Sequence, residues 1–398
     1  MIKQQAEVII VGGGSTGAAI QCFLVRAGIG ATLLVERGML AGGPTGRSPA
    51  IFRQHYGHPE LVKMARYGIE YFRDWSSHSH GTCDYVTAPL LSTVGEENAK
   101  EFAATLALMR NCNVQIDEIA PDDICKLIPG VWTGDVVAAS MEPNAGYCDP
   151  HATVWSFAAE ARRHGGSVLQ FTPVTELLVR ANRICGIRTV DSDIAAPIVI
   201  LAAGPWTSAM AAQIGVTLPI KTRRHSLAQI VQPPSTAWFG LMYADYITGL
   251  YFRPEGKRQF LAGSLLPWDN AEIVNPDRFD EGVSQETFIS IAQRIVHRLP
   301  QWSDAGDGGG WSSLLDVTPD GYPVIGEVDG IDGLYIVAGL SGHGFKLCPA
   351  IAEMLTALVT GIDSAFDTNM FALNRFERNK PIIDLTSYRY EFQRSAAI

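Results

Sequence analysis

Three glycines and one acid near the start of the chain have the types and spacing that bind a dinucleotide. Gly12, Gly14 and Gly17 follow the G-x-G-x-x-G pattern, and Glu36 follows about 20 residues further on. The first glycine allows a tight turn, the second lets a pyrophosphate approach the backbone, and the third lets a helix pack closely on a strand. An acid at this distance accepts both ribose hydroxyls and would repel a 2′-phosphate, so NADP is disfavoured.

A strand–helix–strand unit is expected to position these residues. Val8–Val11 is a short apolar, β-branched run, typical of a strand buried on both faces. Ala18–Ala27 has apolar residues at helical spacing, Gly28 ends it, and Ala31–Val35 predicts a second strand. The helix N-terminus would offer N–H groups and a positive dipole end to phosphates. The combination predicts a Rossmann-type unit, whereas the glycines alone would also fit an ordinary turn.

A second glycine-rich turn lies near the other end of the chain, at Gly339–Pro349 (GLSGHGFKLCP). Leu334–Val337 predicts a buried strand before it, and Cys348–Leu358 predicts a helix after it. This repeats the opening architecture, so a second helix N-terminus is expected to face another electron-rich group. An isoalloxazine suits that place, because its N1–C2=O edge gains negative charge on reduction, and N–H groups with a lysine would stabilise the charge.

Length and charge narrow the class of protein. The 398 residues suggest two lobes. A net charge of −10 argues against nucleic acid as a partner. The one basic cluster, at Lys221, Arg223 and Arg224, fits a solvated crossing between lobes better than a binding patch.

The cysteines and the N-terminal sequence indicate the cellular compartment in which the protein is expected. Seven scattered cysteines without a C-x-x-C pair suggest a reducing compartment and no metal site. The sequence MIKQQ passes directly into the first strand, which leaves no room for a signal peptide. No apolar run reaches the ~18 residues of a membrane span. We therefore expect a soluble, cytoplasmic protein that binds neither nucleic acid nor membrane.

The order of patterns along the chain predicts a discontinuous nucleotide-binding domain. It takes residues 1–85, 145–222 and 308–398, where the strand and glycine patterns recur. Residues 86–144 and 223–307 interrupt that pattern and form the predicted substrate domain. The fold class expected is α/β: a Rossmann-type domain with a second α+β domain built on a largely antiparallel sheet. Gly306–Trp311, rich in glycine, is expected to be a flexible crossing between them.

With these motifs in hand, the sequence resembles the D-amino-acid-oxidase-like superfamily of flavoproteins, in particular its sarcosine oxidase branch. The resemblance covers nearly the whole chain and is most specific at its ends. It rests on VGGGSTG with Glu36-Arg37, GRSPAIFRQHYG at 46–57, GYCDP at 146–150, AAGPWT at 202–207, VTPDGYPVIG at 317–326 and GLSGHGFK at 339–346.

The resemblance implies FAD, with its adenine end at the first glycine-rich turn and its flavin at the second. Val174 would contact the adenine side through its backbone, and Gly342–Lys346 would contact the flavin. The cofactor-binding set it predicts is Gly12, Gly14, Ser15, Thr16, Gly17, Glu36, Arg37, Thr45, Gly46, Arg47, Val174, Gly204, Trp206, Gly342, His343, Gly344, Phe345 and Lys346. No metal is expected.

The resemblance also implies that Arg53 and Lys346 bind a substrate carboxylate. Arginine offers a bidentate fork and lysine a compact charge, which suits that role. For either residue, contact with the flavin instead of the substrate is the alternative. Tyr251, in a predicted strand facing the flavin, is the third catalytic candidate, although a core tyrosine is the commoner case.

Three positions depart from the family's pattern. Ser313 stands where the monomeric enzymes attach flavin to a cysteine, so FAD should be held without a covalent bond. Gly249–Arg253 (GLYFR) offers no match for the family's oxygen-activating lysine, which leaves room for a dehydrogenase. Leu314 and Leu315 replace an arginine expected of D-amino-acid and glycine oxidases, which disfavours those enzymes.

Other polar residues near these motifs are weaker candidates for catalysis. His343 could act as a base, but its place in a glycine turn favours packing under the flavin. His55 and Tyr56 follow Arg53 and could line the pocket. The pair Asp122-Asp123 is expected to be a solvated helix end.

The function predicted is FAD-dependent oxidation of a secondary or N-alkyl amino acid, such as a sarcosine-like compound, imino acid or opine. Hydride transfer to flavin N5 would give an imine that water hydrolyses. The alternatives are a flavin-bearing β-like subunit that passes electrons to a partner chain, and a flavin-binding protein without amine chemistry. A homo-oligomer is left open, and an NAD-dependent dehydrogenase is disfavoured because the C-terminal turn would lack a purpose.

Overall fold

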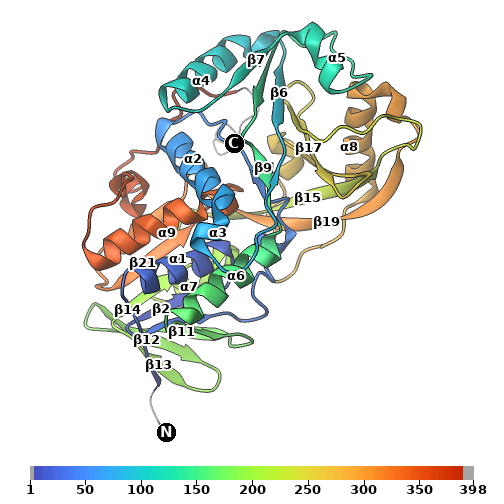
Figure 1. Cartoon of the computed structure of the whole chain (residues 1–398). Coiled ribbons are helices and arrows are strands. Elements are labelled where there is room, and N and C mark those ends of the chain that lie inside the picture. The colour runs from blue at the N-terminus through green and yellow to red at the C-terminus, as the bar shows by residue number, and fades with distance from the viewer. Residues whose placement is uncertain (1–3, 389–398) are drawn as a thin grey trace.

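The computed structural model describes residues 4–388, and two large sheets dominate it (Figure 1). The first has six strands in the order β10-β3-β2-β14-β21-β20. Its neighbours are parallel except for the pair β20–β21. The strands are β2 (Val8–Val11), β3 (Thr32–Val35), β10 (Ser167–Leu169), β14 (Ile198–Leu201), β20 (Val324–Glu327) and β21 (Leu334–Ala338).

Both faces of this sheet are covered, which explains its uninterrupted apolar strands. On one face Ile10, Leu34 and Ile200 pack with the helices α1 (Ser15–Arg26), α6 (Pro150–Arg163) and α9 (Gly344–Thr360). On the other face Ile9, Leu33 and Val199 pack against a small sheet in the order β1-β13-β12-β11. That sheet holds β1 (Gln4–Gln5), β11 (Val174–Arg180), β12 (Arg183–Thr189) and β13 (Asp193–Ala195).

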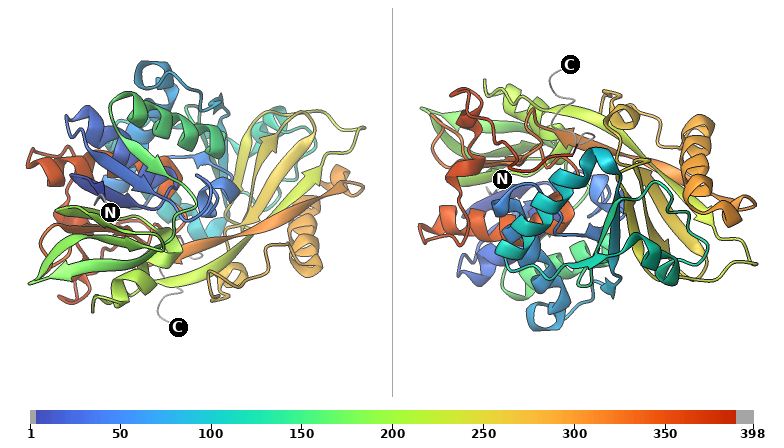
Figure 2. Two further views of the ribbon diagram at one scale, coloured as in Figure 1. Left: turned by 90° about the horizontal axis from the view of Figure 1, so that it is seen from below. Right: turned by 90° about the horizontal axis from the view of Figure 1, so that it is seen from above.

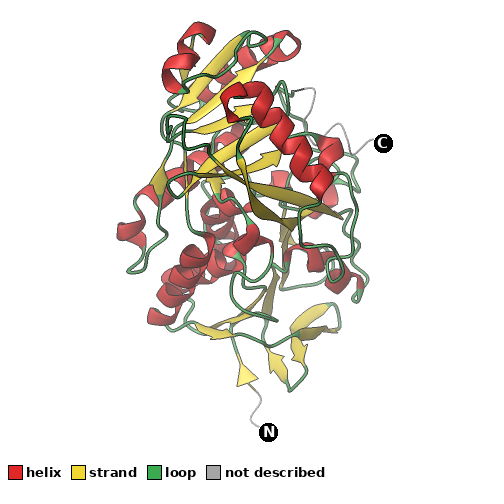
Figure 3. Cartoon of the chain, turned by 90° about the vertical axis from the view of Figure 1, so that its right-hand side faces the viewer, coloured by secondary structure: helices red, strands yellow, loops and turns green. Residues whose placement is uncertain are grey.

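The second large sheet has eight strands in the order β19-β15-β18-β17-β16-β6-β8-β7. All its pairs are antiparallel except β16–β6. The strands are β6 (Leu90–Val94), β7 (Asp117–Ile119), β8 (Ala138–Glu142), β15 (Lys221–Val231), β16 (Met242–Asp245), β17 (Leu250–Glu255), β18 (Gln259–Ser264) and β19 (Gly306–Val317). The helix α8 (Gln285–Arg298) lies across one face of this sheet, over the core around Phe252, Phe260 and Trp302 (Figure 3).

The remaining strands and α-helices lie outside these sheets. They are β4 (Ile51–Phe52), β5 (Val86–Thr87) and β9 (Gly146–Tyr147), which form a three-stranded sheet, and the helices α2 (Pro59–Arg73), α3 (Trp75–His78), α4 (Ala99–Asn111), α5 (Ile124–Leu127) and α7 (Thr207–Ala212). Figure 2 shows the helix-covered parallel sheet on one side and the eight-stranded sheet on the other. None of the described helices is long and apolar enough to cross a bilayer.

The predicted fold class is confirmed, and the predicted domain ranges remain a prediction. The parallel sheet takes strands from 8–35, 167–201 and 324–338, and the eight-stranded sheet takes strands from 90–142 and 221–317. Two local expectations are wrong. Gly306–Trp311 is not a flexible crossing, because it forms the first half of β19 and pairs with β15. The basic cluster at Lys221 begins β15, and Arg223 in it is buried.

Candidate active site

A cavity of about 860 Å³ opens between the two large sheets. It is lined from the parallel sheet by the turns after β2 and β21, and from the eight-stranded sheet by β15, β17 and the end of β19. Every residue that the sequence assigns to cofactor or catalysis lines it, except Gly17 and Gly46. The roles of these residues remain predictions, but their placement in one cavity is a fact of the fold.

The first glycine turn is built by close backbone contacts. Gly12 has a φ of +115°, and a Cβ there would lie 2.3 Å from the Ala202 carbonyl oxygen. A Cβ on Gly17 would lie 2.0 Å from the Gly12 carbonyl oxygen, so this glycine lets α1 pack against β2. Gly46 has a similar packing role, because its Cβ would meet the Ala41 carbonyl oxygen at 2.3 Å. Gly17 and Gly46 therefore pack behind the cavity wall and do not line the cavity.

The N-terminus of α1 faces the cavity, with Gly14, Ser15 and Thr16 among the lining residues. The Ser15 N–H donates to Thr45 Oγ1 at 3.1 Å. Other N–H groups of a first helical turn have no intrahelical partner, which makes this end a site for phosphate.

Glu36 lies at the tip of β3 and is held by two backbone donors. Its Oε2 accepts from the Gly13 N–H at 2.7 Å, and its Oε1 accepts from the Gly38 N–H at 2.8 Å. These bonds fix the carboxylate at the cavity wall, which Val174 also lines, and each oxygen keeps a further lone pair for a ribose hydroxyl.

A loop of residues 271–283 reaches from the eight-stranded sheet to this end of the cavity. Its Asp277 carboxylate accepts from Arg37 at 2.9 Å and from the Trp206 indole N–H at 2.7 Å. The Arg37 guanidinium also stacks 3.8 Å from the Trp206 ring. In the same way Arg47 forms an ion pair of 2.7 Å with Glu281. The two predicted arginines therefore join the loop to the nucleotide-binding turns.

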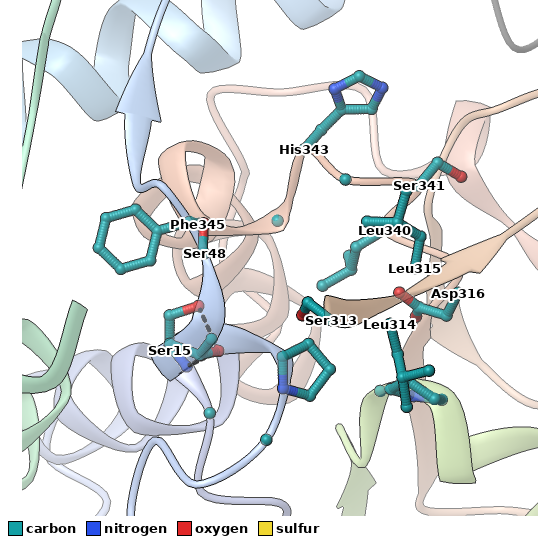
Figure 4. Close-up of a pocket in the computed structure, with 18 of the residues that line it drawn as sticks. Ser15, Ser48, Ser313, Leu314, Leu315, Asp316, Leu340, Ser341, His343 and Phe345 are labelled. Carbon is teal, nitrogen blue, oxygen red and sulfur yellow. Dashed lines mark hydrogen bonds between the residues drawn. The ribbon is translucent and has the colours of Figure 1, made fainter. Parts of the chain in front are cut away.

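The second glycine turn forms the opposite end of the cavity, at the start of α9. It is Asp316, at the end of β19, that holds this turn: its Oδ2 accepts from the Gly339 N–H at 2.7 Å, and its carbonyl accepts from the Ser341 N–H at 2.9 Å. Figure 4 shows Ser313 to Asp316 lying beside Leu340 to Phe345. Burial raises the pKa of Asp316 to about 6, against the backbone donors that lower it.

The helix α9 begins at Gly344, four residues before its predicted start at Cys348. Gly342 has a φ of +82° and lies two residues before the helix. The earlier start brings His343, Gly344, Phe345 and Lys346 to the helix N-terminus, where all four line the cavity.

Arg53 and Lys346 meet in the cavity from sequence positions almost three hundred residues apart. The Arg53 guanidinium lies 4.5 Å from the Tyr56 ring and donates to the His55 carbonyl. The Lys346 Nζ lies 5.9 Å from the same ring. Lys346 is only 6% exposed. Burial, and then the adjacent Arg53 guanidinium, lower the pKa of Lys346 well below its usual range.

Glu142, at the end of β8, is an acid that interacts electrostatically with both Arg53 and Lys346. Its Oε2 accepts a hydrogen bond of 2.7 Å from the N–H of Gln54, the residue that follows Arg53. Burial raises the pKa of Glu142 to about 7, opposed by the Gln54 N–H, Arg53 and Lys346. Arg53, Lys346 and Glu142 thus form one group of interacting titratable side chains at the cavity, the arrangement typical of a binding site.

Two histidines of this region are held neutral. His343 Nδ1 forms a hydrogen bond of 3.2 Å with the Tyr56 hydroxyl, and burial lowers the pKa of His343 well below the usual range. His55 is enclosed by Phe102, Tyr246 and Tyr388, and burial lowers its pKa to about 3. His55 and Tyr56 both line the cavity.

Several side chains of the site were not found from sequence. Asp316 directly precedes the quoted motif VTPDGYPVIG, and Glu142 precedes GYCDP by only a few residues, so proximity to a motif was the available signal. His225 carries no such signal, because the order of strands in the sheet brings it to the cavity, and Asp277 reaches Arg37 and Trp206 from a loop. In the described part of the chain, no group of three or more His, Cys, Asp or Glu side chains could hold a metal ion.

The residues fit a dinucleotide that spans both turns. Two helix N-termini open on one cavity, a fixed carboxylate stands at one end and a lysine at the other, and the volume suffices for a large cofactor. Fold and site thus define an α/β dinucleotide-binding protein. The model of one family, FAD dependent oxidoreductase (DAO), matches residues 7–358, and the chain belongs to that family.

Similar proteins cover nearly all of this chain. A 4-methylaminobutanoate oxidase (formaldehyde-forming) of Paenarthrobacter nicotinovorans is 26% identical over 94% of this chain and 46% of its own. A sarcosine oxidase subunit beta of Arthrobacter sp is 24% identical over 94% of this chain and 92% of its own. The crystal structure of L-proline dehydrogenase from P. horikoshii has a TM-score of 0.86 at 24% identity, covering 96% of this chain and 100% of its own.

The predicted family and FAD cofactor are confirmed by this membership, and the protein is an FAD-dependent oxidoreductase. Ser313, at the place where a cysteine would attach the flavin, lines the cavity, which agrees with FAD held non-covalently. The chain spans about half the length of the first of the relatives above, at 46%.

Proposed function

We propose that the protein oxidises an amino acid whose amine is secondary or N-alkylated. The observation that carries the proposal is that two basic side chains, Arg53 and Lys346, line the same cavity. Such a pair suits a substrate carboxylate, which would also favour the charged form of Lys346. The names of the similar proteins add support, because sarcosine, L-proline and 4-methylaminobutanoate each combine a carboxylate with a secondary amine.

The residues of the chain bind and orient the substrate. The Arg53 fork and the Lys346 ammonium fix the carboxylate, and the carboxylate in turn favours the protonated form of Lys346. The rings of Tyr56 and Tyr246 wall the cavity and exclude water from the reacting C–H bond. FAD, when bound, supplies the acceptor for the hydride and its two electrons. The substrate loses a hydride from carbon and a proton from nitrogen, and water hydrolyses the resulting imine.

Anaerobic mixing with N-methyl amino acids, cyclic imino acids and opines tests this function. We expect at least one of these compounds to bleach the flavin absorbance of the FAD-loaded protein. An Arg53→Ala variant should require a much higher concentration of the same compound. Full activity of that variant would remove Arg53 from the assignment, and a flavin that no amine bleaches would leave a flavin-binding protein without amine chemistry.

A second candidate is a flavin-bearing subunit that passes electrons to a partner chain. The similarity to a sarcosine oxidase subunit beta over 92% of its length favours it. Reoxidation distinguishes the two: an oxidase consumes O2 when purified alone, whereas a subunit is reoxidised by an artificial dye and only slowly by O2. A cytoplasmic location and the oligomeric state stay predictions.

A further inference from the structure

A chain of three polar side chains crosses the cavity wall formed by the eight-stranded sheet. Tyr251 in β17 and His225 in β15 both line the cavity. The Tyr251 hydroxyl lies 2.8 Å from His225 Nε2, and the two ring planes are 5° apart. His225 Nδ1 lies 2.6 Å from Asn270 Oδ1. We propose that Asn270 and His225 fix the Tyr251 hydroxyl as a hydrogen-bond acceptor for the substrate amine N–H, a role that rests on the proposed function.

The orientation of Asn270 follows from its other contacts. This side chain is almost fully buried, and its Nδ2 donates to the carbonyls of Ser264 at 3.2 Å and Leu266 at 3.0 Å. Both neighbours are oxygens that only accept, so the amide cannot be rotated without losing both bonds. Its Oδ1 therefore faces His225.

The tautomer of His225 follows from the orientation of Asn270. An amide oxygen only accepts, so His225 Nδ1 carries the hydrogen. Burial lowers the pKa of His225 and raises that of Tyr251, and both are neutral near pH 7. In the neutral imidazole Nε2 then has a lone pair and no hydrogen. The Tyr251 hydroxyl must donate to it.

Because its hydrogen is donated to His225, the Tyr251 hydroxyl can only accept a hydrogen bond from a ligand in the cavity. A carboxylate or ether oxygen placed there would face the lone pairs of this hydroxyl, whereas an N–H would be accepted. A neutral secondary amine has one N–H, and accepting it orients the nitrogen lone pair for formation of the C=N bond. Tyr251 is thus a catalytic residue of the proposed reaction, and His225 and Asn270 are positioning residues.

Pairs of compounds that differ only at the amine test this proposal. Sarcosine and methoxyacetate form one pair, and L-proline and tetrahydro-2-furoate form the other, with an ether oxygen in place of N–H. The dissociation constant of the amine comes from the concentration dependence of anaerobic flavin reduction in the FAD-loaded protein. That of the ether comes from the perturbation of flavin absorbance.

Tyr251→Phe should weaken amine binding about 10-fold, the size of one hydrogen bond, and leave ether binding within about 2-fold. His225→Leu and Asn270→Leu free the hydroxyl to donate, so each should bind the ether more tightly and the amine less tightly. Tyr67→Phe, on α2 away from the cavity, is the matched control, and melting temperature and FAD content check folding.

Equal loss for amine and ether, or unchanged amine binding in Tyr251→Phe, overturns the proposal while the wild-type protein still reduces its flavin with amines. Loss of FAD affinity with an unchanged amine-to-ether ratio also overturns it, because Tyr251 would then contact the cofactor. If no amine of either pair reduces or perturbs the wild-type flavin, the proposed function fails first, and the acceptor role fails with it.

Discussion

At the scale of single residues, the proposed carboxylate site depends on two basic side chains that line one cavity. Lys346 is buried beside Arg53, and its partner Glu142 is itself held partly protonated. Lys346→Met should therefore lower kcat/KM for a carboxylate substrate about 30- to 100-fold, the size of a charged hydrogen bond. N-methylpropylamine, which lacks the carboxylate, should show no such loss. Lys63→Met, on the exposed face of α2, is the control, and an equal loss for both amines would contradict the assignment.

Glu142 gives a second prediction, on stability against pH. The folded protein holds a proton on Glu142 up to pH of about 7, whereas the unfolded chain releases it at the ordinary glutamate value of 4.5. The free energy of unfolding therefore falls as the pH rises through this window, by about 3 kcal/mol from this group. Relative to the wild type, Glu142→Gln should gain that amount between pH 5 and 8 in urea unfolding of the FAD-loaded protein. Glu377→Gln, exposed near the C-terminus, should gain nothing, and parallel pH profiles for Glu142→Gln and wild type would refute the shift.

At the scale of elements, loop 271–283 joins the eight-stranded sheet to the nucleotide-binding turns. Asp277 is half-exposed, so its contacts with Arg37 and Trp206 are worth about 1 kcal/mol or less. Asp277→Asn should raise the dissociation constant of FAD about 2- to 5-fold, with a larger effect at low salt, as measured by quenching of flavin fluorescence. Asp280 lies in the same loop but pairs with Arg224, so Asp280→Asn is the matched control. Equal effects of the two variants would mean that the loop acts on FAD in another way.

Elements with a strong local pattern could be predicted from the sequence. The bounds of β2 match the predicted Val8–Val11, and the unit from β2 to β3 forms as expected. Gly306–Trp311 could not be predicted, because glycines have low strand propensity and only pairing with β15 makes this segment a strand. Arg53 and Lys346 lie within recognisable motifs, whereas His225 reaches the site through the order of strands in a sheet, which no local pattern encodes.

At the scale of the whole molecule, the cavity is a shared boundary of both large sheets, with one glycine turn at each end. A ligand that binds only the folded chain raises its free energy of unfolding by about 2.7 kcal/mol at one hundred times the dissociation constant. ADP and riboflavin each fill one end, so each should raise the melting temperature by a small amount. FAD joins the two halves covalently, so its second contact is intramolecular, and its effect at equal concentration should exceed the two together. Calorimetry of protein freed of flavin checks this. If ADP alone gave the full shift of FAD, the turn before α9 would not hold the flavin, and the assignment of Gly342 to Lys346 would be lost.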